Sequence, residues 1–125
     1  MKINLLNPMI LAENYKELAG WYVKTFDLAI KTRVEEGEEY MELGTSSEVL
    51  FGFARAKEMG VKPSTPRNNT VIIQLSVSDI SELFDKVKKA GGKILFGPSL
   101  SKEEGYLYGG LEDIEGNQIW VIERG

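Results

Sequence analysis

The sequence predicts an α+β domain made of two βαβββ modules, which form a cup-shaped mixed sheet with the helices outside. Two observations predict this class. Short strand-like segments and amphipathic helical segments follow one another in the order strand, helix, three strands, and the order then repeats. The helix residues also align at one constant spacing, from Asn14 to Asp79, from Leu18 to Leu83 and from Tyr22 to Val87. Each module alone leaves one sheet face uncovered, so two modules are expected to form one domain over residues 1–125.

The first module is predicted over residues 1–54. Residues 3–11 form a mostly apolar strand, which Asn7 and Pro8 place at a sheet edge or bulge. Asn14 then caps a helix over 15–26, with Glu17 completing a capping box. The remaining strands are predicted at 29–35, 39–43 and 49–54, separated by turn residues around Gly37 and Gly44.

Residues 55–69 differ in character from both neighbours. They carry Lys57, Lys62, Arg67 and two prolines, and few large apolar side chains. This composition is typical of an exposed connection, so we predict a linker between the modules.

The second module is predicted over residues 70–125. A strand over 70–77 leads to Ser78 or Asp79, which caps a helix that Gly91 and Gly92 end. A strand over 93–96 and a polar loop over 97–105 follow. The last strands, 106–112 and 118–124, flank the turn Asp113-Ile114-Glu115-Gly116-Asn117.

Composition excludes several classes of function. At 125 residues, 42% apolar and 27% charged, the chain has the make-up of an ordinary globular domain. A net charge of −4 repels phosphate backbones, which argues against a nucleic-acid partner. The first residues contain no long apolar run, so we expect neither signal peptide nor membrane anchor, and a cytoplasmic protein.

The sequence contains no cysteine and no histidine. Disulfides and thiolate chemistry are thereby excluded. Imidazole is the commonest ligand of transition metals and the commonest general base near neutral pH. A zinc or iron site would need a shell of carboxylates or amides, which those ions rarely use. We therefore predict no metal site and no cofactor.

Three stretches together resemble the vicinal oxygen chelate superfamily, which includes glyoxalase I, extradiol dioxygenases and bleomycin-resistance proteins. The first is Asn14 followed by Trp21-Tyr22 and Phe26-Asp27-Leu28; the second runs from Val77-Ser78-Asp79-Ile80 to Lys89-Ala90-Gly91-Gly92; the third is Leu111-Glu112-Asp113-Ile114-Glu115-Gly116-Asn117. The resemblance implies the fold predicted above and says little about activity, because one fold hosts many chemistries.

The resemblance also implies where a divalent metal would bind. The first-strand ligand position, seven residues before the helix cap, corresponds to Asn7 and Ile72, and the last-strand position corresponds to Trp120. The matching strand of the first module, residues 49–54, offers no acid, amide or imidazole. Isoleucine and tryptophan are not metal ligands, so the fold matches and the metal centre is missing.

Strand alternation predicts which side chains face the cup. For residues 49–54 the sequence leaves two choices, Phe51 with Phe53 or Leu50 with Gly52. The predicted ligand-binding residues are Asn7, Met9, Leu11, Phe51, Phe53, Gln74, Ser76, Tyr106, Tyr108 and Trp120. Aromatic rings with a few amides are typical of a pocket for a planar or amphipathic molecule, although aromatic side chains also fill cores.

Three functions compete. The first is a metal-free, bleomycin-resistance-like protein that binds a small aromatic or amphipathic molecule. The second is a lyase, isomerase or dioxygenase-type enzyme of the same superfamily with an atypical site, using Glu13 or a tyrosine; no catalytic residue is assigned. The third is a non-catalytic scaffold with a filled cup. The sequence favours binding over catalysis, and the resemblance implies a homodimer.

Overall fold

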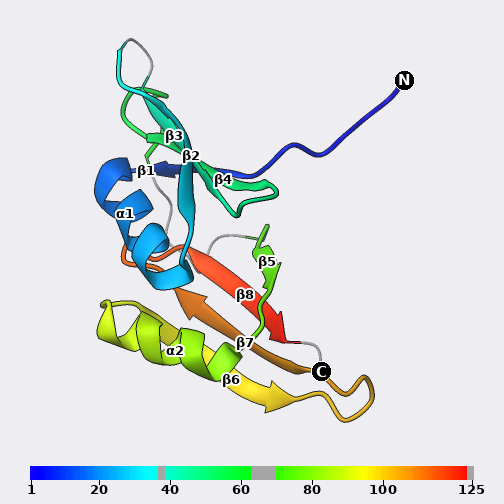
Figure 1. Ribbon diagram of the computed structural model, residues 1–125. Helices are drawn as coiled ribbons and strands as arrows, with labels where there is room; N and C mark the ends of the chain where they lie inside the picture. The colour runs from blue at the N-terminus through cyan, green and yellow to red at the C-terminus, as the bar shows by residue number, and fades with distance from the viewer. Residues whose placement is uncertain (37–38, 63–69, 124–125) are drawn as a thin grey trace. The chain divides into compact units, whose positions relative to one another are not determined.

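The protein is described by a computed structural model that covers residues 1–36, 39–62 and 70–123 (Figure 1). The chain divides into two compact units, Met1–Pro63 and Ser64–Gly125. Each unit is a βαβββ module with a four-stranded mixed sheet. The α+β class with two such modules is therefore confirmed. That the two modules form a single domain stays a prediction.

The first unit contains one helix and four strands. They are β1 (Met9–Ala12), α1 (Tyr15–Phe26), β2 (Ala29–Val34), β3 (Tyr40–Gly44) and β4 (Val49–Arg55). The strands lie in the order β1-β4-β3-β2. β1 runs parallel to β4, whereas β3 is antiparallel to both β2 and β4. The first and last strands of the module are thus neighbours, with β1 at one edge of the sheet.

The core of the first unit lies between this sheet and α1. Phe51 and Phe53 are fully buried, and their ring centroids lie 5.2 Å and 5.4 Å from that of Tyr22 on α1. Leu43 on β3 and Leu18 on α1 complete the layer, with no exposed surface. Because side chains alternate along a strand, the residues between these face away from the helix.

The predicted cap of α1 is confirmed. The Glu17 backbone N–H donates to Asn14 Oδ1 at 3.3 Å, and Asn14 Nδ2 donates to Glu17 Oε2 at 3.0 Å. The helix ends at Asp27, which adopts the left-handed conformation with φ 55°. Both helix ends are therefore set by local side-chain and backbone chemistry.

A polar network joins the start of α1 to the strands. The Tyr15 hydroxyl donates to Glu39 Oε2 at 3.2 Å, and Arg55 donates to the same oxygen at 3.1 Å. The Arg55 guanidinium also lies 5.5 Å from the centroid of the Tyr15 ring. Burial of the hydroxyl, together with the hydrogen bond to the Glu39 carboxylate, raises the pKa of Tyr15. Tyr15 is thus a buried hydrogen-bond donor at neutral pH.

The second unit has the same arrangement. Its elements are β5 (Ile73–Ser76), α2 (Ile80–Lys89), β6 (Lys93–Leu100), β7 (Leu107–Glu112) and β8 (Gln118–Glu123), with strand order β5-β8-β7-β6. β5 runs parallel to β8, and β7 is antiparallel to β6 and β8. In Figure 1, α2 lies along one face of this sheet.

The helix of the second unit is held to its sheet by apolar packing and by hydrogen bonds. Val87 on α2 and Val121 on β8 are fully buried. Of the two predicted caps, Ser78 and Asp79, the N-cap is Asp79, with its carboxylate accepting from the Glu82 N–H at 3.0 Å. Glu123 Oε1 accepts from the Ile80 N–H at 2.7 Å, which ties the start of α2 to β8. The other face of this sheet has no helix of its own unit over it.

Two strands differ in length from the prediction. β1 spans Met9–Ala12 rather than 3–11, because its pairing with β4 begins at Met9 and Pro8 has no N–H to donate. β6 continues to Leu100, beyond the predicted end at Phe96. Ser99 and Leu100 pair with β7 across register shifts that accommodate Gly97 and Pro98. The predicted loop 97–105 is therefore reduced to the turn that follows Leu100.

Part of the predicted linker lies in regular structure. Arg55 ends β4, and the Ala56 N–H donates to the Ala12 carbonyl at 2.8 Å. Residues 63–69 of the linker lie outside the described residues, as do Gly37 and Glu38 of the predicted hairpin tip. In the described part of the chain, no helix is both long and apolar enough to cross a membrane.

The turn between β7 and β8 is organised by one buried carboxylate. Asp113 is 4% exposed, and its Oδ1 accepts from the backbone N–H groups of Glu115 at 2.9 Å and Asn117 at 3.0 Å. The Asn117 side-chain amide donates to Oδ2 at 2.9 Å. The turn that the sequence predicts thus has the Asp113 carboxylate at its centre.

Replacing this acceptor is expected to destabilise the fold. Asp113→Ala leaves partly buried donors unpaired, so the free energy of unfolding should fall by about 2 kcal/mol. Urea denaturation followed by circular dichroism measures the change. Glu103→Ala, at an exposed carboxylate, is the control and should change stability by about 0.5 kcal/mol or less. Equal stabilities of the two variants would contradict this role for Asp113.

Candidate functional site

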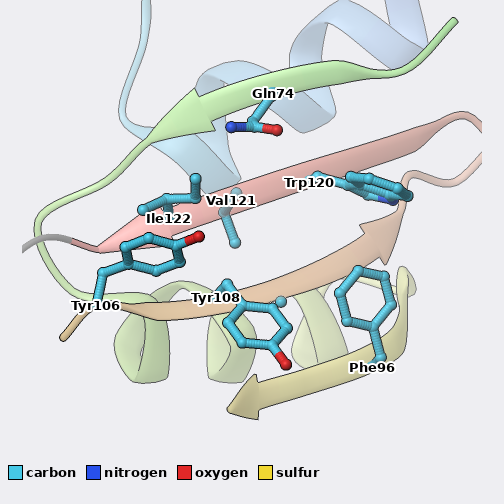
Figure 2. Close-up of a pocket in the computed structure, with 8 residues that line it drawn as sticks. Gln74, Phe96, Tyr106, Tyr108, Trp120, Val121 and Ile122 are labelled. Atoms are coloured by element: carbon cyan, nitrogen blue, oxygen red, sulfur yellow. The ribbon is translucent and has the colours of Figure 1, made fainter. Parts of the chain in front are cut away.

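The open face of the second sheet carries a pocket of about 390 Å³. All of its lining residues belong to the second unit: Gln74, Phe96, Tyr106, Tyr108, Gly109, Trp120, Val121 and Ile122. Figure 2 shows the side chains of Gln74 on β5, Phe96 on β6, Tyr108 on β7 and Trp120 on β8, with Tyr106 just before β7. The pocket is thus formed by every strand of this sheet, on the side away from α2.

Trp120 lies at the centre of this face. It pairs with Gln74 across the parallel β5–β8 ladder and with Gly110 across the β7–β8 ladder. Its neighbours along β8, Ile119 and Val121, are fully buried, whereas Trp120 is 40% exposed. Strand alternation therefore puts the indole on the open face while the flanking side chains enter the core.

The aromatic side chains form one continuous row. The centroid of Phe96 lies 5.7 Å from Trp120, with the rings nearly perpendicular, and 6.4 Å from Tyr108. Tyr106 continues the row at 6.2 Å from Tyr108. These distances are those of favourable aromatic pairs, so the rings support one another even though they are partly exposed.

Two adjacent glycines make room for the row. A Cβ on Gly110 would lie 2.3 Å from Phe96 Cε1, so the Phe96 ring rests directly on the β7 backbone. A Cβ on Gly109 would lie 2.6 Å from Phe84 Cζ, on the helix side of the same strand. Gly110 thus allows the pocket to have Phe96 as a wall, and Gly109 allows α2 to pack closely beneath it.

None of the lining residues carries a formal charge. The polar groups are the Gln74 amide, the hydroxyls of Tyr106 and Tyr108 and the indole N–H of Trp120, which together offer hydrogen-bond donors and acceptors. Aromatic faces with a few uncharged polar groups can stack on a flat molecule and fix its orientation.

The structure brings four of the predicted site residues together, namely Gln74, Tyr106, Tyr108 and Trp120. Ser76 lies two residues beyond Gln74 on β5 and is exposed, outside the lining. Asn7, Met9 and Leu11 belong to the first unit. For all of these predicted site residues, a role in ligand binding stays a prediction.

Phe51 and Phe53 lie on the face of the first sheet that α1 covers, and not on its open face. Both are fully buried against Tyr22 of α1, so they belong to the core of the first unit. The sequence left two pairs as candidates for the open face of β4, Phe51 with Phe53 or Leu50 with Gly52. In the structure, the second pair faces away from the helix. The choice of Phe51 and Phe53 as open-face residues is therefore corrected.

The predicted ligand-binding residues include neither Phe96 nor Ile122. Alternation does place Ile122 on the cup face, because it shares the parity of Trp120. Phe96 was hidden by the irregular pairing of β6, because register shifts between Ile94 and Ser99 break simple alternation. Phe96 is opposite Gly110 on β7. In the sequence, the pair Gly109-Gly110 was the only sign that a side chain packs closely against the β7 backbone.

The open face of the first sheet differs at the corresponding place. Met9 pairs with Gly52 as Gln74 pairs with Trp120, so Gly52 occupies the position equivalent to Trp120. A Cβ on Gly52 would lie 2.1 Å from Met9 Sδ, which shows the thioether resting on the strand backbone. The two modules share a topology, and only the second has an aromatic side chain at this central place.

A hollow of about 480 Å³ in the first unit is lined by Glu13, Ala56, Lys57, Val61 and Lys62. It contains no aromatic side chain. Glu13, the residue considered as a general base, therefore lines this hollow and not the aromatic pocket.

Comparison with known proteins identifies the family. Residues 4–121 match the family model described as the Glyoxalase/Bleomycin resistance protein/Dioxygenase superfamily. The chain belongs to this superfamily. The resemblance in the sequence is thereby confirmed. A search of curated proteins gives no match.

Solved structures of similar fold cover nearly the whole chain. Hypothetical protein SA1046 from S. aureus has a TM-score of 0.77 at 20% identity, covering 99% of this chain and 96% of that one. A glyoxalase/bleomycin resistance protein/dioxygenase family enzyme from Burkholderia phytofirmans has a TM-score of 0.74 at 12% identity, with coverage of 94% and 95%. A superfamily member from Sphaerobacter thermophilus has 0.73 at 17%, covering 98% of each chain. These similarities establish the fold alone.

The residues at the family's metal positions do not fit a divalent ion. Trp120 and Ile72 have no ligand atom for one, and Gly52, equivalent to Trp120, has no side chain. The Asn7 amide nitrogen donates to the Pro8 carbonyl at 3.2 Å. Among residues 1–36, 39–62 and 70–123, no group of three or more acidic side chains is placed to hold a metal. This set of side chains does not match the ligands that divalent ions use in proteins.

Alanine substitutions at Gly110 and Gly109 are expected to have different effects on stability. Gly110→Ala should displace the Phe96 ring, because the new methyl group would meet only the far end of this side chain, which is 38% exposed, and should shift the NMR signals of the Trp120 indole with little loss of stability. Gly109→Ala should lower the free energy of unfolding by about 2 kcal/mol, because Phe84 and the Phe96 carbonyl oxygen at 2.9 Å block the new methyl group. Urea denaturation and two-dimensional NMR distinguish the two. An unchanged Trp120 signal in Gly110→Ala would contradict the close contact with Phe96.

Proposed function

We propose that the protein binds a small planar or amphipathic organic molecule in the aromatic pocket of its second module. The observation that carries the proposal is the exposure of the aromatic row. Trp120 is 40%, Phe96 38% and Tyr108 37% exposed around one hollow. Apolar surface gathered in one place on a folded protein is characteristic of a binding site, because leaving it in water is unfavourable.

The dimensions and polarity of the pocket support this function. A volume of about 390 Å³ falls in the range that small-molecule sites occupy. The rings supply apolar contact area, and the Gln74 amide can pair with one polar group of a ligand. Burial of one aromatic face of a ligand against Trp120 contributes on the order of 1–3 kcal/mol.

Binding is favoured over catalysis by the chemistry of the lining residues. General acid–base catalysis most often uses histidine, a carboxylate or lysine, and none of these is among the lining residues. The family includes, by its description, bleomycin resistance proteins. We place this chain with members that act by binding, and we retain the cytoplasmic location that the sequence predicts.

Removal of the indole tests the binding function. Trp120→Ala should weaken the binding of quinoline, 2-naphthol and acridine at least about ten-fold, because each loses its stacking surface. Isothermal titration calorimetry measures the dissociation constants. Leu100→Ala is the matched control, since Leu100 is an exposed apolar residue outside the lining. Stabilisation of the protein by divalent metals, with no compound bound, would contradict the proposal.

We also propose that the protein forms a homodimer through its N-terminal segment, residues 1–6. Ile3, Leu5 and Leu6 are 81%, 94% and 87% exposed. The segment forms neither helix nor strand and leads into β1, which begins at Met9 (Figure 1). A run of exposed apolar side chains is stabilised when a second copy covers it.

Charge placed in this segment should prevent association. The double variant Ile3→Asp/Leu5→Asp should sediment as a monomer at concentrations where the unmodified chain is a dimer. Analytical ultracentrifugation measures the mass. Lys57→Asp, on an exposed turn of the same unit, is the control and should leave the dimer unchanged. A monomeric unmodified chain would refute the proposal.

A further inference from the structure

We propose that the aromatic pocket of the second module selects planar organic cations over neutral and anionic molecules of the same shape. The inference rests on the proposed binding function and specifies its ligand class. It follows from three features of the second unit: the ring surfaces of the lining, the absence of charge among the lining residues, and the distribution of charged residues around them.

The ring surfaces attract positive charge. The faces of Trp, Tyr and Phe rings carry negative electrostatic potential, and a cation within about 6 Å of a ring centroid is attracted to it. Neighbouring centroids of the row from Trp120 through Phe96 and Tyr108 to Tyr106 lie 5.7–6.4 Å apart. A flat cation seated on this row is therefore within reach of more than one ring face.

The lining residues provide no positively charged partner for an anion. No lysine or arginine is among them, and a carboxylate or phosphate buried against the rings would lose its hydration without gaining a cation. For a cation the cost is smaller, because the ring faces replace part of the hydration. The Gln74 carbonyl oxygen and the tyrosine hydroxyls add acceptors for an N–H group.

The charged residues near the pocket also favour a positively charged ligand. Lys86, Lys88 and Lys89 lie on α2, which packs on the other face of the sheet. The exposed turn before Tyr106 carries Glu103 and Glu104 with one lysine, Lys102. On the strands, Lys93 pairs with Glu112 across the β6–β7 ladder.

The open face therefore lacks the lysines of the helix, and the turn beside it carries more carboxylates than ammonium groups. A field of this sign raises the local concentration of cations and lowers that of anions.

Three probes with the same bicyclic ring system separate charge from shape. They are 1-methylquinolinium, a permanent cation; 2-methylquinoline in its uncharged form at mildly alkaline pH; and quinoline-2-carboxylate, an anion. Isothermal titration calorimetry on the unmodified chain should give a dissociation constant about ten-fold lower for the cation than for the neutral compound, and weaker binding still for the anion.

Substitutions at Trp120 identify the source of the preference. Trp120→Leu keeps an apolar side chain without a ring face, so the ratio between cation and neutral compound should fall toward one. Trp120→Phe keeps a ring face and should retain part of the ratio. Circular dichroism shows whether each variant is folded, and Leu100→Ala is the control that should keep the full ratio.

The outcomes are distinguishable. Equal binding of the cation and the neutral compound, or tighter binding of the anion, overturns the inference and leaves the proposed binding function intact. No binding of any of the three probes overturns both. A cation preference that persists in Trp120→Leu also overturns the inference, because the ring face would not be its source.

Discussion

The structure depends on one constraint, which is that a strand presents alternate side chains to opposite faces of its sheet. In each module the helix covers one face, and the fully buried residues Val121 in the second unit and Phe53 in the first lie beneath it. Every residue between such positions is directed to the face that the module's own helix leaves uncovered. A register change of one residue would exchange Trp120 with Val121 and would destroy the core and the pocket together. The site is therefore a consequence of the same pairing that holds the fold.

Departures from regular alternation shape the pocket within that constraint. Gly109 and Gly110 remove side chains from both faces of β7, so Phe84 approaches from the helix and Phe96 from the edge strand. In the first module a methionine lies over Gly52 at the equivalent place. The same topology thus gives two different surfaces: an uncharged aromatic pocket in one module, and a face whose centre has no aromatic side chain in the other. This asymmetry is why the candidate site belongs to the second module.

Much of the fold was predictable because its signals are local. Asn14 and Asp79 act as helix caps through contacts with residues three positions ahead, and Asp113 organises a turn within its own segment. The pocket was only partly predictable. Gln74 and Trp120 follow from alternation, but Phe96 depends on a bulged register with β7, and the orientation of Phe51 and Phe53 depends on which face α1 covers. Register and helix placement are properties of paired elements, and one strand's sequence does not determine them.

The central claim is that Trp120 is the main contact surface for a small planar molecule. Nitrogen-15 NMR during a titration with quinoline tests it most directly, because the chain has two tryptophans in contrasting environments. Trp120 is exposed in the pocket, and Trp21 is buried in the first unit. The claim predicts a saturable shift of the Trp120 indole N–H signal, together with that of the Gln74 side-chain amide, and an unmoved Trp21 signal. A Trp120 signal that stays in place while quinoline binds, or the absence of any saturable shift, would contradict it.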